Sequence, residues 1–483
     1  MEMKDLFYAM PLLIVGGGIL LILLIDMFFK GGKKIIPALT FFILLGTAYY
    51  SLFTINQLPI GLMPVSEFGL FYGMLSFGGK AHLFYFLFNF GSAIAVLIAN
   101  DYLKKIETEY SEYYILLLSS VLGMMLIAGS RNLVMIFIGL EQMSISFYAL
   151  AGYRRKNILS NEAALKYFLL GSFATGFLIY GMAFIFGTAQ SMMLIDIFSQ
   201  TSVLVKNPLF MIGILLFLIG FTFKIAAVPF HMWAPDVYEG SPTSVTALMA
   251  TVGKAAAFSA ILLIFVSVAK MGPNSVFSSM FSVVAVLSML YGSIAAIAQK
   301  DIKRMLAYSS IAHAGYMTIG LAAVNPSGIA GIIFYLVAYT FMNLGAFGII
   351  ALLESKEGKF LSIEDYKGLG TRQPFLAASL AIIMFALSGI PPFAGFFGKY
   401  YIFLAAIQSG DTWLALVGVL SSVISVYFYL RVVVYMYFSK SDDESAILEI
   451  SQTGLLAVIA SLVLVIAFGL APGSLIRLIS GLI

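Results

Sequence analysis

The stretch that decides the fold is 221-FTFKIAAVPFHMW-233, where a lysine and a helix-breaking proline interrupt an apolar run that begins near Pro208. A second apolar run contains 389-GIPPFAGFFGKYY-401, with the same two features in reverse order. Proline removes a backbone donor, and irregular backbone at membrane depth is tolerated only where protein covers it or where it lines a cavity. Both runs are therefore predicted to be discontinuous helices.

The composition of the whole chain indicates that most of its surface faces lipid. Of the 483 residues, 61% are hydrophobic and only 10% are charged, which could not present a water-soluble surface. A helix needs about twenty apolar residues to cross a hydrocarbon layer roughly 30 Å thick. Marking such stretches predicts an all-α polytopic membrane protein with about fourteen transmembrane helices.

The two interruptions fall in the predicted helices 7 and 12, which lie five segments apart. Helices 4 to 8 and 9 to 13 are therefore predicted to be two copies of one five-helix unit, and an odd-numbered unit repeated in tandem must be inverted in the membrane. We predict one transmembrane domain over 1–483. Its four parts are three N-terminal helices in 1–111, the first repeat in 112–270, the inverted second repeat in 271–440 and a last helix in 441–483.

The basic residues predict the orientation, since cytoplasmic loops are the richer ones in Lys and Arg. Assigning loops to alternate sides leaves one side with only Lys4, Lys80, Arg131, Lys206, Lys270 and Arg477. Both termini are therefore predicted on the non-cytoplasmic side of a bacterial cell (inner) membrane. A net charge of +4 is small, so the expected surroundings are a lipid bilayer and no nucleic acid.

The sequence offers no site for a cofactor. With no cysteine, the chain can hold neither a thiolate metal site nor an iron–sulfur cluster. No phosphate-binding loop, dinucleotide-binding fingerprint or zinc-protease motif appears. We therefore expect neither cofactor nor metal in this chain, and any redox chemistry would belong to another subunit.

Glu141 and Lys224 are the first candidates for chemistry. Glu141, in the stretch GLEQMS, lies near the middle of its predicted helix, where an unpaired carboxylate is costly. Lys224 precedes the first helix break by about one turn. Burial favours a neutral lysine and a nearby carboxylate favours the ammonium, so a moving Glu141 would switch the proton of Lys224 on and off. The alternatives are a protonated structural acid and a static ion pair.

Two further lysines extend the pattern. Lys254, in TVGKAAAF, lies too deep in its predicted helix to reach the interface, and Lys399 follows the second helix break. Together with Lys224 they predict a row of lysines along the membrane midplane. Three lysines and one glutamate within apolar runs, with two of the lysines at broken helices, indicate an ion path.

Four residues are candidates for supporting roles. His313 lies mid-helix in the predicted counterpart of the Glu141 helix and could relay protons, or could simply bond a neighbouring helix. His231 lies near the predicted cytoplasmic end of helix 7 and could mark a proton entrance or an ordinary interfacial loop. Lys166 is predicted to begin a helix one turn after Glu162, as a surface pair or as a group that tunes the Glu141 site. Glu112 lies near a helix end.

At these residues the sequence resembles the antiporter-like subunits of respiratory complex I, and among them the subunit N group of the bacterial proton-pumping NADH:quinone oxidoreductases. The resemblance covers nearly the whole chain. It rests chiefly on GLEQMSISFYALAGYRR at 139–155, NEAALKYFLLGSFATGFLIYG at 161–181, FKIAAVPFHMWAPDVYEGSPTSVTALMATVGKAAAF at 223–258 and QKDIKRMLAYSSIAHAGYM at 299–317.

The resemblance implies fourteen helices with two inverted five-helix repeats, and it implies that Glu141, Lys224, Lys254 and Lys399 transfer protons. It also implies partners: other membrane subunits, including a homologous antiporter-like one, and subunits elsewhere that hold NADH, FMN, iron–sulfur clusters and quinone. The wider family includes subunits of multisubunit Na⁺/H⁺ antiporters and of membrane-bound hydrogenases. Two alternative functions follow. The chain could be a subunit of such an antiporter or hydrogenase, or a structural coupling subunit without its own proton path.

Overall fold

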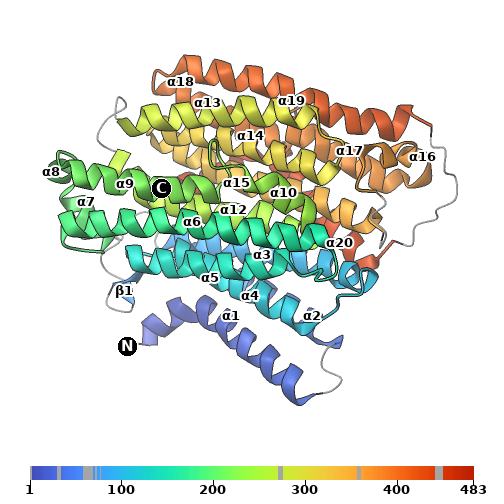
Figure 1. Cartoon of the computed structure of the whole chain (residues 1–483), viewed down its shortest axis with the longest axis horizontal. Coiled ribbons are helices and arrows are strands. Elements are labelled where there is room, and N and C mark those ends of the chain that lie inside the picture. Colours follow the sequence, from blue (N-terminus) through green and yellow to red (C-terminus); the bar gives the residue numbers. More distant parts are fainter. Residues whose placement is uncertain are drawn as a thin grey trace.

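The computed structural model describes residues 3–29, 34–57, 69–70, 73–76, 78–269, 276–355, 360–440 and 450–482. Lys270, and the domain boundaries predicted at 270/271 and 440/441, touch residues outside these ranges. Nearly all of the described chain is helical, and most helices run along one common direction (Figure 1). One short antiparallel strand pair, β1 (Gly69–Leu70) with β2 (Leu75–Ser76), adds to the predicted all-α architecture.

The helices follow one another in the order α1 (Met3–Phe28), α2 (Ile36–Gln57), α3 (Gly79–Lys105), α4 (Ser111–Ala128), α5 (Leu133–Ala151), α6 (Ile158–Ala189), α7 (Leu194–Ser199), α8 (Thr201–Leu204), α9 (Pro208–Lys224), α10 (Trp233–Gly240), α11 (Thr243–Leu248), η2 (Met249–Gly253), α12 (Lys254–Ala269), α13 (Val276–Ile297), α14 (Ile302–Ala322), α15 (Pro326–Leu353), η3 (Ile363–Tyr366), α16 (Leu369–Arg372), α17 (Pro374–Ser388), α18 (Ala394–Gln408), α19 (Thr412–Phe438), α20 (Gln452–Leu470) and α21 (Pro472–Gly481).

Over the described residues, eleven helices are long and apolar enough to cross a membrane, with α11, η2 and α12 forming one of them. The shorter apolar helices α9 and α17, together with α14, complete the predicted fourteen. The central helix is α15, whose apolar window is entirely buried, whereas only 28% of the corresponding window of α1 is buried. Figure 1 shows α1 along the edge of the bundle. The predicted fold is confirmed.

Both predicted helix breaks are present. The first separates α9, which ends at Lys224, from α10, which begins at Trp233. Its backbone is covered by protein: the Trp233 indole Nε1 donates to the carbonyl of Phe223 (2.9 Å), and the amide of Val228 donates to Ser288 Oγ (2.9 Å). These bonds satisfy groups that a continuous helix would have satisfied internally.

The second break separates α17, which ends at Ser388, from α18, which begins at Ala394. Gly389 takes the left-handed conformation there (φ 88°), which glycine adopts without steric cost. A cis peptide precedes a proline in each break, at Pro229 and at Pro392.

The helix that carries Lys254 departs from regular geometry. Its middle, Met249–Gly253, is a π-helical segment, and Lys254 is the first residue after it. π-Helical segments are rare in proteins, and those that occur are often found at functional sites. The sequence pattern predicted a lysine deep in an ordinary helix, and no residue type in MATVG marks the π-helical turn.

Glycines let two helix pairs approach closely beside the candidate site. A Cβ atom built on Gly181 of α6 would lie 2.6 Å from the carbonyl oxygen of Gly213 on α9, and one on Gly213 would lie 3.0 Å from that of Gly181. Gly123 of α4 and Gly139 of α5 face each other in the same way, at 2.6 and 2.7 Å. These contacts position α5 and α9, which carry Glu141 and Lys224.

The start of α6 differs from the prediction. The helix begins at Ile158, where the side chain of Asn157 accepts a hydrogen bond from the amide of Ser160 (3.1 Å) and caps it. Lys166 therefore lies well inside α6 and does not begin it. The prediction took the polar stretch before 163 for a loop, but an Asn cap with its following turn forms helix in such a stretch.

Candidate functional site

Lys224 and Glu141 lie on neighbouring helices without forming an ion pair. The buried Lys224 ammonium donates to Ser144 Oγ (2.7 Å) and to the hydroxyl of Tyr148 (3.3 Å). Glu141 accepts from Thr175 Oγ1 of α6 (2.8 Å). Glu141, Ser144 and Tyr148 occupy one face of α5, since residues three, four and seven apart are aligned on a helix. Ser144 thus stands one turn from the carboxylate and in contact with the ammonium.

Lys254 is buried against α14. Its ammonium donates to the carbonyl of Ser310 (2.7 Å) and to the Ser310 hydroxyl, and it lies 5.8 Å from the centre of the Tyr339 ring. Within the described chain no carboxylate lies within 4.0 Å of it. The polar contacts of the Lys254 ammonium are therefore the two oxygens of Ser310 and the face of the Tyr339 ring.

His313 of α14 is buried, and both of its ring nitrogens form hydrogen bonds. Nδ1 lies 2.6 Å from the hydroxyl of Tyr335 and Nε2 lies 2.9 Å from that of Tyr429. The ring also packs against Tyr339, with centroids 5.0 Å apart, and against Tyr316, with centroids 5.7 Å apart. A histidine between two hydroxyls can accept a proton on one side and release one on the other.

Lys399 of α18 ends the series. Its ammonium donates to the carbonyl of Ser388, at the second helix break, and to Ser422 Oγ, both at 2.8 Å. It lies 4.8 Å from the centre of the Tyr316 ring. Because Tyr339 contacts both Lys254 and His313, and Tyr316 contacts both His313 and Lys399, the structure brings these three predicted residues into one continuous buried line.

Phe147 lies beside the Lys254 end of this line. The ring of Phe147, beside Tyr148 on α5, packs against Gly253, the residue before Lys254: a Cβ atom there would lie 2.7 Å from the ring. In the part of the chain that the structure describes, no hydrogen bond joins the partners of Lys224 to those of Lys254. The site therefore consists of two buried groups that no described hydrogen bond joins.

Lys166 lies in an ion-pair network at the end of the bundle, away from Glu141. Its ammonium pairs with Glu162 and with Asp236, both at 2.6 Å, and Arg304 joins Asp236 (2.7 Å) to Glu239 (2.6 Å). Burial opposes the ionisation of Asp236, but hydrogen bonds from Lys166 and Arg304 outweigh it and hold the pKa of Asp236 below its usual value.

The other two supporting candidates lie outside the buried line. The ring of His231, in the first helix break, packs against Tyr291 with centroids 4.5 Å apart, and its Nδ1 has no hydrogen-bond partner among the described residues. Glu112 is exposed in the first turn of α4. The structure therefore brings neither residue into contact with the four principal candidates.

Glu354 is a buried carboxylate that the sequence reasoning missed. It directly follows the last residue of α15, with 1% of its surface exposed. It accepts from the hydroxyls of Tyr102 (3.1 Å) and Thr243, with Arg154 at 3.5 Å. It lies one residue past an apolar helix in the charged stretch 354-ESKEGK-359, so its type and position are those of an ordinary loop residue. Its partners come from distant parts of the chain.

We expect Glu354→Gln to destabilise the chain by about 1 kcal/mol, because the amide keeps the shape but weakens three charge-assisted contacts. The measurement is the midpoint of thermal unfolding in detergent. Glu364→Gln is the control, since Glu364 is mainly exposed and its ion pair within the described chain is with Lys367 at 3.3 Å. Equal midpoints for the two variants would contradict a structural role for Glu354.

A family model described as "NADH:quinone oxidoreductase/Mrp antiporter, TM" matches residues 130–425, which include both broken helices and all four principal candidates. Two curated relatives named NADH-quinone oxidoreductase subunit N are each 46% identical. The one from Chloroherpeton thalassium aligns over 84% of this chain and 85% of its own length, and the one from Trichlorobacter lovleyi over 82% of both.

Solved structures agree with these matches. A chain of the respiratory complex I from Thermus thermophilus with bound aureothin is 32% identical, with a TM-score of 0.81 over 97% of this chain and 98% of its own. A chain of the Mrp complex from Dietzia sp. DQ12-45-1b has a TM-score of 0.85 over 100% and 97%, but at 18% identity it shares the fold alone. The chain therefore belongs to the NADH:quinone oxidoreductase/Mrp antiporter family, within its subunit N group.

Proposed function

We propose that this chain is the proton-translocating, antiporter-like subunit of an NADH-quinone oxidoreductase, and that its protons pass along Glu141, Lys224, Lys254, His313 and Lys399. The observation that carries the proposal is the buried line of Lys254, Tyr339, His313, Tyr316 and Lys399 across the middle of the bundle. Ionisable groups are costly there and are retained for ion movement rather than packing. The relatives' names supply NADH and quinone, which would bind to other subunits. The resemblance adds FMN and iron–sulfur clusters, which would also belong to other subunits.

The surroundings of the lysines suit proton transfer. Lys224, Lys254 and Lys399 are held by hydroxyls and carbonyls, which accept hydrogen bonds from an ammonium without neutralising its charge. Such sites leave the charged and neutral forms close enough in free energy for a moving charge to switch them. Rotation of Glu141 from Thr175 toward Lys224 would draw a proton to that lysine, and its return would release the proton.

Passage between the two buried groups needs a conformational step. No hydrogen bond among the described residues joins the Lys224 site to Lys254, and protons do not cross an apolar gap. A shift of Phe147 that admits water would connect the two groups, as hydration gates act in other proton-conducting sites. We infer that redox energy from quinone reduction elsewhere in the complex drives this shift, since the chain performs no redox step of its own.

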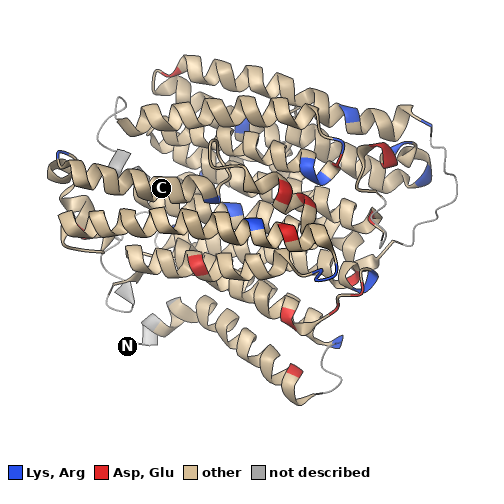
Figure 2. Ribbon diagram, in the orientation of Figure 1, with Lys and Arg blue, Asp and Glu red and all other residues tan. Residues whose placement is uncertain are grey.

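The distribution of charge supports the predicted orientation. Charged residues gather toward one end of the helices, at the right in Figure 2, and are sparse at the other. We propose that the charged end is cytoplasmic and that both termini lie on the opposite side of a bacterial inner membrane. We also propose the division into 1–111, 112–270, 271–440 and 441–483, which follows from the proposed five-helix repeat. His231, Lys166 and Glu112 would lie near the points where protons enter.

The proposal is tested by interrupting the line at His313. We expect His313→Leu to lower donor-driven proton pumping about threefold to tenfold in the assembled complex, since water can bridge part of the gap. Pumping is measured in membrane vesicles by quenching of a pH-sensitive dye on addition of NADH, with assembly checked by native electrophoresis. His82→Leu is the control, because His82 is a buried histidine of α3 outside the line.

Unchanged pumping by an assembled His313→Leu complex would overturn the proposed line. Proton exchange that requires Na⁺ and persists without an electron donor would instead identify a secondary antiporter. Failure of both histidine variants to assemble would be followed by His313→Gln, which keeps a hydrogen-bonding side chain but cannot carry a proton at neutral pH. Pumping at the full rate by that variant would also contradict the relay.

A further inference from the structure

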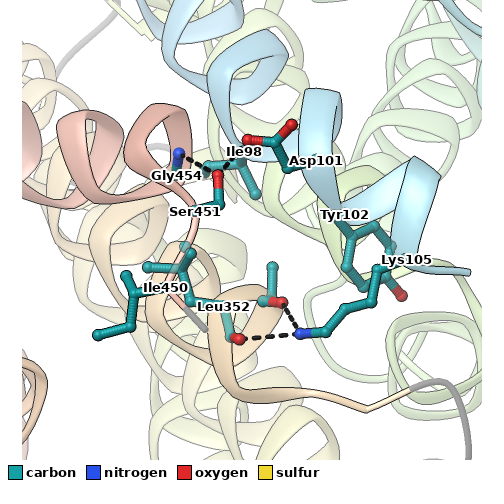
Figure 3. Close-up of a pocket in the computed structure, with 10 residues that line it drawn as sticks. Ile98, Asp101, Tyr102, Lys105, Leu352, Ile450, Ser451 and Gly454 are labelled. Carbon is teal, nitrogen blue, oxygen red and sulfur yellow. Dashed lines mark hydrogen bonds between the residues drawn. The ribbon is translucent and has the colours of Figure 1, made fainter. Parts of the chain in front are cut away.

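A pocket of about 440 Å³ opens between α3, α15 and α20 and contains none of the residues of the proton line (Figure 3). Its volume is within the range of small-molecule sites, roughly 300–1,000 Å³. Apolar side chains line part of it and polar ones the rest. Those used below are Ile98, Asp101, Lys105, Leu352, Ile450 and Ser451.

The two charged groups of this pocket differ in their compensation. Asp101 pairs with Lys104 (3.1 Å) and also accepts from Thr453 Oγ1 (2.7 Å) and from the Ser451 hydroxyl. Lys105 donates to the carbonyl of Leu352 (2.9 Å), and no carboxylate among the described residues lies within 4.0 Å of it. Among the described residues, Asp101 is therefore closely compensated, whereas Lys105 has only the more distant charge of Glu354.

The position of the pocket suggests the chemistry of an anion that would pair closely with Lys105. Lys105 is the last residue of α3 and Ser451 caps the start of α20, so the pocket lies where these helices leave the apolar layer. Phospholipid phosphates lie at this level of a bilayer, and basic pockets between transmembrane helices on the cytoplasmic side bind lipid headgroups. Ile98, two turns deeper in α3, and Leu352 continue the pocket as an apolar wall.

We propose that this pocket binds a membrane phospholipid, with its phosphate paired to Lys105 and the start of an acyl chain against Ile98 and Leu352. A glycerol or ethanolamine headgroup also carries donors for Asp101, whose side chain remains 32% exposed. The lipid would fill the space between α3, α15 and α20 and join three helices that are distant in sequence. This binding site is independent of the proposed proton path.

The test uses the purified complex and a phosphatidylglycerol that carries a photoreactive diazirine, with cross-linked peptides mapped by mass spectrometry. We expect labelling of peptides that contain 98–105 and 450–454. Lys105→Gln should lower this labelling about tenfold, the equivalent of one charge-assisted hydrogen bond, and Lys105→Arg should retain it. The matched control is Lys104→Gln, which removes the same charge from the neighbouring residue and should change labelling less than twofold.

Competition distinguishes the sources of the phosphate. Excess dioctanoyl-phosphatidylglycerol should abolish labelling, whereas dioctanoylglycerol and inorganic phosphate should not. Equal losses in Lys104→Gln and Lys105→Gln would show general surface attraction and overturn the proposal. Competition by dioctanoylglycerol would show an apolar groove only, and competition by inorganic phosphate a site for a soluble anion; either result would also overturn it. Pumping by Lys105→Gln should stay within twofold of the unmodified complex.

Discussion

Replacing Lys224 with alanine is expected to lower proton pumping by roughly tenfold or more while the complex still assembles. Loss of a positioned proton-transfer group costs about 10²–10⁴ in enzymes, and water in the vacated space would recover part of that. The structure also predicts limited damage to the fold, because among the described residues the ammonium donates only to the hydroxyls of Ser144 and Tyr148. Hydroxyls can turn to other acceptors, whereas an orphaned carboxylate could not.

The measurement is NADH-driven acidification of membrane vesicles together with quinone reduction, normalised to assembled complex on native gels. We expect both activities to fall together if proton transfer is coupled to electron transfer. Lys206→Ala is the control, since Lys206 is an exposed lysine just before α9 and should retain full activity. If the Lys224→Ala complex assembles and both activities persist, Lys224 is not in the path.

The second large effect is on stability. Gly181→Ala is expected to destabilise the chain by about 3 kcal/mol, the upper end for inserting one methyl group into a packed interface. The added carbon would lie 2.6 Å from the carbonyl oxygen of Gly213 and 2.6 Å from the amide nitrogen of Phe217. Both are backbone atoms, so relief requires α6 and α9 to move apart. Lys224 ends α9 and would move with it.

Gly187→Ala is the matched control on the same helix, because a Cβ atom there meets nothing within 4 Å. It should be neutral or slightly stabilising, since alanine is the better helix former. Both variants are compared by the midpoint of thermal unfolding in detergent and by the yield of assembled complex. A Gly181→Ala variant as stable as Gly187→Ala would show that the two backbones are not in contact.

The class, the helix count and the two interruptions were readable from the sequence, because lipid imposes strong local requirements. Each crossing needs a long apolar run, and Pro229, Pro391 and Pro392 cannot continue a helix inside one. Lys224, Lys254 and Lys399 stood out for the same reason, since charges are rare in such runs. These are properties of a residue and its immediate neighbours, which a sequence displays directly.

Contacts between distant segments could be decided only by the tertiary structure. Nothing near Glu141 in the sequence indicates that Thr175 binds it, or that Lys224 reaches Ser144 instead. His313 gains its partners from other helices, and the partners of Glu354 come from α3, from α11 and from the loop after α5. Local free energies determine which segments are helices, but the partner of each buried polar group is determined by helix packing, which depends on close backbone contacts such as that of Gly181 with Gly213.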